Sequence, residues 1–191
     1  NAVKENCDEC PGAVKEDVRV FASDKTVVDR LVKSMHDKDM RLVLDIVCNH
    51  SSPEPRVDKG GRPVKGELYD DGKLLTSYEN DKLGWYHRNG GVSDWNNKGQ
   101  VETSELCGLA DFNESHIGYR TYIKDALRLW LNKGIDGFRV DTVKHMPLWF
   151  WQEFVSDMVF HRPDLYVFGE WFQGGCYDDL SVQFMNKSGM G

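Results

Sequence analysis

The stretch IDGFRVD at residues 135–141 says most about the fold, because it is a short run that ends in charged residues and follows a helix stop, Lys133-Gly134. We interpret it as a β-strand. A second run, RLVLDIV at residues 41–47, is apolar, contains β-branched residues and does not alternate with polar ones. That pattern is typical of a strand covered on both faces, as in a parallel sheet. A third run, LYVFGE at residues 165–170, ends in a carboxylate.

Apolar residues recur at helical spacing in three further segments. They predict helices from Asp24 to about Lys38, over residues 117–132, and from about Pro147 to Phe160, the first with Ser23 or Asp24 as its cap. The order is therefore helix, strand, insert, helix, strand, helix, strand. Such alternation indicates βα units and a parallel sheet, so we predict an α/β fold.

Residues 51–115 have a different composition, rich in Gly, Asn, Asp, Pro and aromatic residues, with no sustained period. A structureless loop of that length is uncommon inside a compact domain, so we interpret it as a small irregular subdomain inserted after a strand. The chain then divides into residues 1–50, the insert 51–115, and residues 116–191. The first ~22 residues and the tail after Trp171 show no clear period and are predicted to be loop.

Charge and hydropathy exclude two classes of partner. The formal net charge is -7, and an acidic chain of this kind repels phosphate backbones, so we expect no nucleic acid. No apolar run approaches the roughly 18 to 20 residues that span a bilayer, so we expect no membrane insertion. The N-terminal residues do not resemble a signal peptide, and because residue 1 is not Met we expect the true start to lie upstream.

The five cysteines cannot all pair within one chain. Cys7 and Cys10 form a lone C-x-x-C motif. Zinc binding would need a second ligand pair, which does not follow, and a redox role would need a strand–helix context that this stretch does not supply. We interpret them as free or locally bridged thiols, and the compartment stays open.

Polar side chains follow the C-terminal ends of all three predicted strands: Asp45, Asn49 and His50; then Arg139 and Asp141; then Glu170. In a (β/α)8 barrel these strand ends converge on one active-site face. Three such clusters on successive strands are hard to explain by packing. The pattern is typical of the active-site face of such a barrel.

Asp141 and Glu170 are expected to face each other across a cleft. Two carboxylates about 5 to 5.5 Å apart suit a retaining glycosidase, and a gap of about 6.5 to 9.5 Å suits an inverting one. Arg139 lies two residues before Asp141 on the same strand face and favours its ionised form, as a nucleophile requires. Glu170 is flanked by Phe168 and by the aromatic residues 171–172, and apolar surroundings favour the protonated form of a general acid. Taken alone, such a pair is more often structural than catalytic.

Four segments together resemble the α-amylase family, glycoside hydrolase family 13. DIVCNH at 45–50, GFRVDTVKH at 137–145 and FGEW at 168–171 are similar to three of its signature segments, and LADFN at 109–113 to the end of its inserted domain B. They occur in the family's order and spread over about two thirds of the chain.

The resemblance implies roles for particular residues. Asp141 would be the nucleophile, Glu170 the acid/base and Arg139 a positioning partner. Substrate contacts would come from His50, Lys144, His145 and Phe172. Trp85, Tyr86 and Trp95 are candidates for stacking on sugars, and a buried place in the core of the insert is equally compatible with them.

The resemblance also implies a Ca²⁺ ion between barrel and insert. Its ligands would be Asn49, Asp111 and the backbone carbonyl of His145, and oxygen ligands from several segments suit this hard cation. A loop cap is the alternative role of Asp111.

Within the family, LYDDG at 68–72 and YHRNGG at 86–91 resemble the branch of cyclodextrin glucanotransferases and maltogenic amylases. Cyclising members have an aromatic ring four residues before the calcium aspartate, where this chain has Cys107. We therefore expect a retaining α-glucan hydrolase acting on α-1,4 bonds. The alternatives are a cyclising transglycosylase and a non-catalytic amylase-like protein for assembly or sugar binding.

Two departures accompany the resemblance. The fourth signature of the family, with a third carboxylate, has no match after Glu170, and the first strands of the barrel have none before Asp24. The resemblance thus implies an α/β fold that is a partial (β/α)8 TIM barrel, with about three of the eight βα units present and an irregular inserted domain B, and we expect the remainder of the barrel on further chain. The family resemblance favours an extracellular or periplasmic location.

Overall fold

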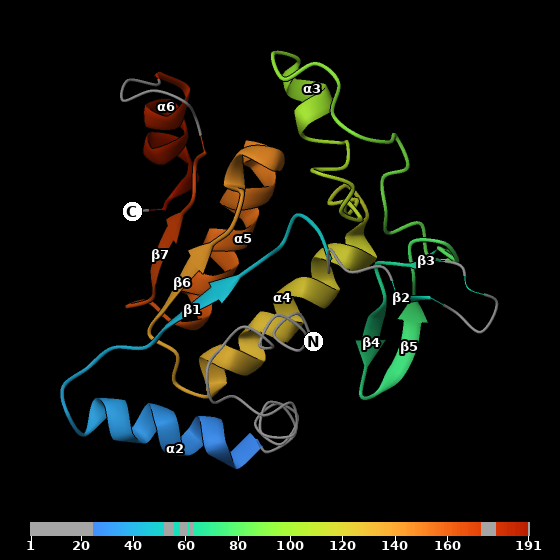
Figure 1. The fold of residues 1–191 in the computed structure, drawn as a ribbon. Coiled ribbons are helices and arrows are strands. Elements are labelled where there is room, and N and C mark those ends of the chain that lie inside the picture. Colours follow the sequence, from blue (N-terminus) through green and yellow to red (C-terminus); the bar gives the residue numbers. More distant parts are fainter. Residues whose placement is uncertain (1–24, 52–55, 58–60, 62, 173–178, 191) are drawn as a thin grey trace, which may run out of the picture.

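A three-stranded parallel sheet forms the centre of the molecule (Figure 1). The computed structural model describes residues 25–51, 56–57, 61, 63–172 and 179–190. The strand order is β1 (Val43–Ile46), β6 (Gly137–Val140), β7 (Tyr166–Gly169). Each predicted strand is present, and a register without shifts brings the three C-terminal ends level at one edge of the sheet.

Helices connect these strands as the sequence predicts. α2 (Lys25–His36) precedes β1, α4 (Ile117–Asn132) precedes β6, and α5 (Leu148–His161) joins β6 to β7. α4 has the predicted bounds and is followed, after its cap Lys133, by Gly134, whose φ of +91° is a conformation that L side chains rarely adopt. The predicted cap of α2, Ser23 or Asp24, lies outside the described residues.

The prediction of loop throughout the tail after Trp171 is wrong. The structure has a helix there, α6 (Asp179–Ser188), which packs against α5. Its apolar residues do not form one buried face, since Leu180, Val182 and Met185 are each more than half exposed. Phe184 packs on Trp171, with their ring centroids 5.2 Å apart. Gly189, at φ +83°, follows the last helical residue.

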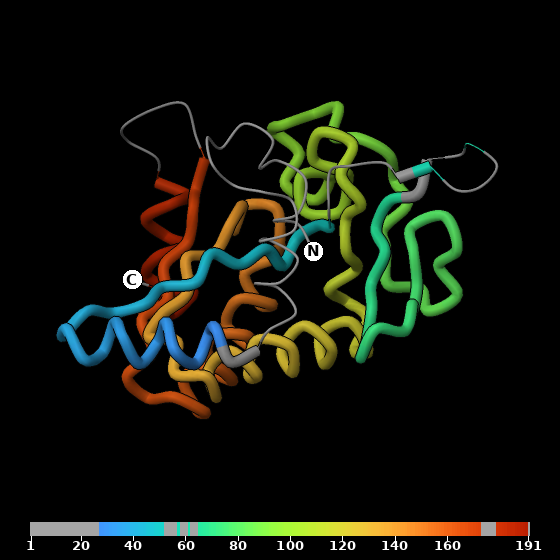
Figure 2. Tube along the Cα trace, turned by 60° about the horizontal axis from the view of Figure 1, so that its bottom comes forward, coloured from blue at the N-terminus to red at the C-terminus, as the bar shows by residue number. Residues whose placement is uncertain are grey.

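Between β1 and α4 the chain forms small elements in place of a continuous layer (Figure 2). Two antiparallel pairs are β2 (Arg56–Val57) with β3 (Pro63–Val64), and β4 (Leu68–Asp70) with β5 (Lys73–Thr76). A single helical turn, α3 (Lys98–Val101), follows them. This agrees with the irregular insert that the composition predicts; domain boundaries at residues 50 and 115 stay a prediction.

Aromatic packing ties the insert to α4. Phe112 stacks on Tyr119 of α4 at 4.5 Å between ring centroids and lies 5.0 Å from Tyr86. Trp85 contacts Tyr122 at 5.4 Å. These rings continue into one apolar core with Phe138 of β6 and the fully buried face of α5. The insert is therefore held firmly beside the C-terminal end of the sheet.

At the opposite, N-terminal end of β6, Asp136 is only 7% exposed. Its oxygens accept hydrogen bonds from the Leu42 amide (2.8 Å), Arg41 (3.2 Å) and Arg162 (3.1 Å), and His36 Nε2 lies 2.8 Å away. Burial alone would raise the pKa of Asp136, but the hydrogen bonds with the Leu42 amide, His36 and Arg41 lower it to about 2. This carboxylate thus joins α2, β1 and the end of α5 to β6.

Two cysteines fall in the described part of the chain, Cys48 buried and Cys107 exposed, and both are free thiols. Cys7 and Cys10 lie outside it. No helix among the described residues is long and apolar enough to cross a bilayer.

Candidate active site

The three strand ends meet at Arg139, as the sequence predicts. Its Nη1 donates to Asp45 Oδ1 and to Asp141 Oδ1, each at 2.8 Å, and its Nη2 lies 3.1 Å from Glu170 Oε2. The hydrogen bond with Asp45, then that with Asp141, raises the pKa of Arg139. One guanidinium thus holds a carboxylate from each strand of the sheet.

Backbone hydrogen bonds fix where the two predicted catalytic carboxylates start. The amide of Asp141 donates to Ile46 O at 2.9 Å, and that of Glu170 donates to Val140 O at 2.8 Å. Each residue therefore follows the last residue of its strand and still makes the backbone hydrogen bond of a parallel sheet. The two side chains leave the sheet from neighbouring strands at the same level.

A tight turn after β6 packs against the end of β7. Thr142 has the left-handed φ of +47°, and its amide donates to Glu170 Oε2 at 3.3 Å. A Cβ at Gly169 would lie 2.6 Å from Val143 Cγ1, so only glycine allows this approach. Glu170 is therefore held by the turn that begins at Asp141.

The surroundings of Glu170 differ from the apolar environment that its aromatic neighbours predict. Its side chain is 37% exposed and pairs with Arg139, while Phe172 is 80% exposed. The register explains the difference, because Arg139 lies opposite Phe168 and its long side chain reaches the next residue on that strand face, Glu170.

The predicted metal ligands lie together and are buried. Asn49 and Asp111 are each 1% exposed, and Asn49 Nδ2 donates to Asp111 Oδ1 at 2.9 Å and to the His145 carbonyl at 3.0 Å. His50 Nδ1 lies 3.1 Å from Asn49 Oδ1. An antiparallel bridge between His50 and Asp111 joins β1's end to the insert.

Burial dominates the titration of this cluster. It raises the pKa of Asp111 to about 6, and it lowers the pKa of His50 and of His145. The charge of Asp141 acts in the opposite sense on both histidines. Both rings are thus favoured as neutral hydrogen-bonding groups.

Two groups in this cluster were not predicted. His87 Nδ1 lies 2.8 Å from Asp111 Oδ2, and the Val101 carbonyl lies 3.2 Å from His145 Nδ1. Burial alone would lower the pKa of His87, but the hydrogen bond with Asp111 and the charge of Glu114 raise it. The YHRNGG segment contains His87, yet its spacing gives no sign of contact with Asp111, and a carbonyl leaves no sequence signal.

These residues fit a hard cation in donor type. Asn49 Oδ1, the Asp111 carboxylate and the His145 carbonyl are oxygen donors, and the amide nitrogen of Asn49 donates to the last two. Across the described ranges, no group of three or more His, Cys, Asp or Glu side chains gathers as a metal site.

A cleft of about 640 Å³ is lined by Glu170, whereas Asp141 and His50 are not among its lining residues. Its lining also includes Trp95, Cys107, Lys144, His145 and Phe172. Trp95 is 52% exposed, whereas Trp85 and Tyr86 are buried at 8% and 5%. Of the three aromatic residues with two possible roles, Trp95 therefore faces the cleft, and the other two belong to the core.

Comparison with known proteins agrees with this geometry. Residues 21–178 match the family described as alpha amylase, catalytic domain. A cyclomaltodextrin glucanotransferase of Niallia circulans is 42% identical over 161 residues, which are 84% of this chain and 22% of that protein. An α-amylase of the same organism is 38% identical over 161 residues, 84% of this chain and 30% of that protein.

Solved structures agree as well. The crystal structure of CldA, a cyclomaltodextrin glucanotransferase with a three-domain ABC distribution, superposes with a TM-score of 0.78 at 38% identity. The match covers 85% of this chain and 33% of that one, so the chain spans about a third or less of the proteins that it resembles. The chain therefore belongs to the α-amylase family, glycoside hydrolase family 13, and its sheet and helices are part of that family's (β/α)8 barrel.

Proposed function

We propose that the complete protein containing this chain cleaves α-1,4-glycosidic bonds of starch-like α-glucans with retention of configuration. The observation that supports this most is that Asp141 and Glu170 both contact Arg139 at the C-terminal edge of the sheet. A cleft lined by Glu170, Trp95 and Phe172 lies at this edge. Paired carboxylates that flank a glycosidic bond are the usual machinery of glycosidases.

Asp141 acts as the nucleophile in the first step. One of its carboxylate oxygens bonds to the anomeric carbon while Glu170 donates its proton to the glycosidic oxygen, and the bond between that oxygen and the anomeric carbon breaks. In the second step the Glu170 carboxylate takes a proton from water. The water oxygen bonds to the anomeric carbon, Asp141 is released, and two inversions give net retention.

Arg139 positions both carboxylates for these steps. Because it pairs with Asp141 and Glu170 through different nitrogens, it orients the nucleophile and the acid relative to each other. His50, Lys144 and His145 are proposed to bind sugar hydroxyls, and Phe172 and Trp95 to pack on sugar rings. Aromatic faces suit the C–H faces of sugars.

Transfer to another sugar in place of water is the second candidate, because relatives with 42% and 40% identity are cyclomaltodextrin glucanotransferases. Both reactions use the same two carboxylates. Cys107, exposed at the cleft, has no ring on which a curled glucan could pack, which favours hydrolysis. We therefore expect linear maltooligosaccharides as main products.

A Ca²⁺ ion is proposed to join the insert to the sheet through Asn49, Asp111 and the His145 carbonyl. Bound there, it would neutralise the buried Asp111 and fix the cleft wall formed by the insert. Because such an ion binds only the folded state, chelation should lower the melting temperature of the complete protein. A melting temperature unchanged by chelation and by added Ca²⁺ would contradict this assignment.

The test compares the complete protein with its Glu170→Gln and Asp141→Asn variants on a defined maltooligosaccharide. The unsubstituted protein should release products whose anomeric configuration, followed by NMR, is that of the substrate. Each variant should lose roughly 10³-fold or more in kcat, because each removes a reacting group.

The matched control is Asp164→Asn, which removes an exposed carboxylate at the other end of the sheet and should keep activity. Chromatography of the products separates linear from cyclic glucans. Near-normal activity in either catalytic variant, or a product with inverted anomeric configuration, would contradict the proposal. Absence of α-glucan cleavage by the unsubstituted protein would favour the non-catalytic alternative.

A further inference from the structure

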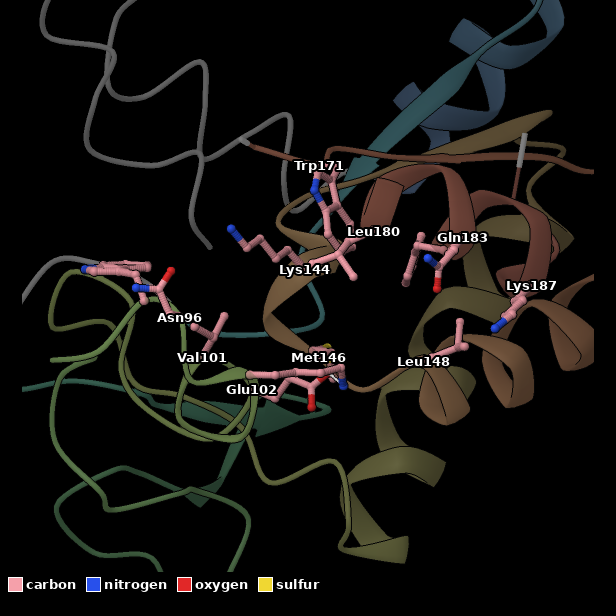
Figure 3. A pocket seen from close by; sticks show the side chains of 13 residues that line it. Asn96, Val101, Glu102, Lys144, Met146, Leu148, Trp171, Leu180, Gln183 and Lys187 are labelled. Carbon is pink, nitrogen blue, oxygen red and sulfur yellow. Dashed lines mark hydrogen bonds and ion pairs between the residues drawn. The ribbon is translucent and has the colours of Figure 1, made fainter. Parts of the chain in front are cut away.

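A tight turn of the insert, residues 106–109, forms part of the wall of the cleft. Leu106 and Cys107 line the cleft together with Glu170. They do not line the neighbouring cavity of about 290 Å³ between the α3 segment and α6, which Figure 3 shows. A change in the position of this turn, which we call the Cys107 turn, would therefore alter the cleft and leave that cavity as it is.

The backbone of the Cys107 turn is strained. The Leu109 amide donates to the Leu106 carbonyl at 2.9 Å, and the two central residues, Cys107 and Gly108, have φ angles of +51° and +78°. Two positive φ angles are typical of a type I′ turn, in which Asn, Asp and Gly are preferred. A cysteine rarely has a positive φ, so contacts from elsewhere in the insert must hold this conformation.

Lys65 supplies such contacts. Its Nζ donates to Glu105 Oε2 and to the Gly108 carbonyl, each at 3.0 Å, and these two acceptors lie on either side of Cys107 in the chain. The ammonium also lies 4.2 Å from the centre of the Tyr78 ring. The side chains of Lys65 and Glu105 are only 22% and 10% exposed, so solvent and salt screen this pair less than an exposed one.

Both partners of this ion pair have a fixed backbone. The Lys65 amide donates to Glu79 Oε2 at 3.1 Å, and the Lys65 carbonyl accepts from the Tyr78 amide at 3.0 Å. The Glu105 amide donates to the Gly90 carbonyl at 2.8 Å. Lys65 does not line the cleft, so it can act on a bound ligand only through the turn that it holds.

We propose that Lys65 is a positioning residue for substrate binding, because it holds the Cys107 turn in the place where that turn shapes the cleft. This assignment rests on the proposed function and adds to it a residue that does not contact the substrate. Without the ammonium, the largely buried Glu105 carboxylate loses its cation and the Gly108 carbonyl loses a donor. The strained backbone at Cys107 can then relax, and the wall of the cleft moves with it.

The first measurement needs no glucan. Hydrogen exchange of the complete protein, followed by mass spectrometry of a peptide that covers residues 105–109, reports how often the turn opens. Lys65→Met keeps a long unbranched side chain but removes the donors. Loss of one or two hydrogen bonds should raise the exchange rate of this peptide by roughly threefold to tenfold. Lys65→Arg keeps the charge and N–H donors and should restore most of the protection.

The second measurement tests the consequence for binding. Lys65→Met should raise KM for maltoheptaose by roughly threefold to tenfold and leave kcat nearly unchanged, because a wall of the cleft contacts ground state and transition state alike. The control is Lys73→Met, which removes an exposed cation of β5 that lines neither cavity. It should leave both exchange and KM unchanged.

A double-mutant cycle tests the strain. Asn adopts a positive φ more readily than Cys, so Cys107→Asn should hold the turn without help from Lys65. In the Cys107→Asn background, Lys65→Met should therefore have little effect on exchange or on KM. An effect of equal size in both backgrounds would contradict the idea that Lys65 acts by holding Cys107 in its conformation.

The outcomes separate the two claims. If Lys65→Met lowers the melting temperature but leaves KM unchanged, the positioning assignment is overturned and the proposed function stands. Unchanged exchange of residues 105–109 overturns it as well. If the unsubstituted protein neither cleaves nor binds any α-glucan, the proposed function fails. The role of Lys65 in substrate binding then fails with it, even where exchange shows that Lys65 holds the turn.

Discussion

Both ends of β6 place a carboxylate against arginine, but the two ends differ in how many contacts the carboxylate makes. Asp136, at the N-terminal end, has two partners on each oxygen: Arg41 and Arg162 on Oδ1, and the Leu42 amide and His36 on Oδ2. At the C-terminal end, Asp141 contacts Arg139 through Oδ1 alone, and Asp141 Oδ2 has no protein partner within the described part of the chain.

This difference separates a structural carboxylate from a chemically available one. A carboxylate has about four acceptor sites, and Asp136 fills them with groups from three elements. Asp141 and Glu170 keep side-chain exposures of 22% and 37%, so a substrate can reach them. Asp136 and Asp141 have the same residue type and charge. Their burial and the number of their hydrogen-bond partners decide whether each carboxylate is accessible to a ligand.

The largest expected effect on stability comes from Asp136→Asn. The amide keeps the shape but loses the charge that His36, Arg41 and Arg162 surround, so we expect a loss of about 3 kcal/mol in the free energy of unfolding. Urea denaturation of the complete protein measures it. Asp141→Asn is the comparison, and it should cost less than about 1 kcal/mol because its carboxylate is partly exposed. Equal losses at the two ends would contradict the distinction.

The next effect concerns activity. Arg139→Lys keeps the positive charge but replaces a planar fork by one nitrogen, which cannot contact Asp141 and Glu170 through separate atoms. We expect kcat to fall about 100-fold, because misplacing a reacting group by a small distance can lower the rate by that factor. KM for maltotriose and the melting temperature should change little. A loss confined to KM, or an equal loss in stability, would show that Arg139 does not position the two carboxylates.

Acid should selectively weaken the contacts that Asp136 makes at the N-terminal end of β6. The pKa of Asp136 is lowered to about 2 from an ordinary value near 3.8, so its contribution is complete above about pH 4 and is lost as the pH falls toward 2. That contribution is about 2 kcal/mol. Denaturation curves of the unsubstituted protein and Asp136→Asn between pH 5 and pH 2 should therefore converge. A gap that stays constant over this range would rule out the ion pairs as its source.

Sequence reasoning predicted the carboxylates at the C-terminal end of β6 but missed the contacts of Asp136 at its N-terminal end, and the reason is physical. Asp141 and Glu170 are recognisable because strand ends in a parallel sheet must converge, so three local patterns predict one site. The partners of Asp136 are separated from it by between 26 and 100 residues, and no periodicity connects them. The same applies to His87, which contacts Asp111 across 24 residues of irregular chain, and to α6, whose packing against α5 leaves no local signal in the sequence.

The smallest effect distinguishes the two arginines that contact Asp136, namely Arg41 and Arg162. The Arg162 side chain is 20% exposed and also donates to the Ile135 carbonyl at 2.6 Å, whereas Arg41 is 71% exposed. Solvent weakens the Arg41 pair, so Arg41→Ala should cost less than about 1 kcal/mol. Arg162→Ala also leaves a carbonyl without its donor and should cost roughly 1 kcal/mol more. Urea denaturation of both variants gives the difference, and salt should reduce the smaller loss first, since exposed pairs are the more strongly screened. If Arg41→Ala costs as much as Arg162→Ala, net charge around Asp136, and not the completeness of its buried hydrogen bonds, stabilises this end of the sheet.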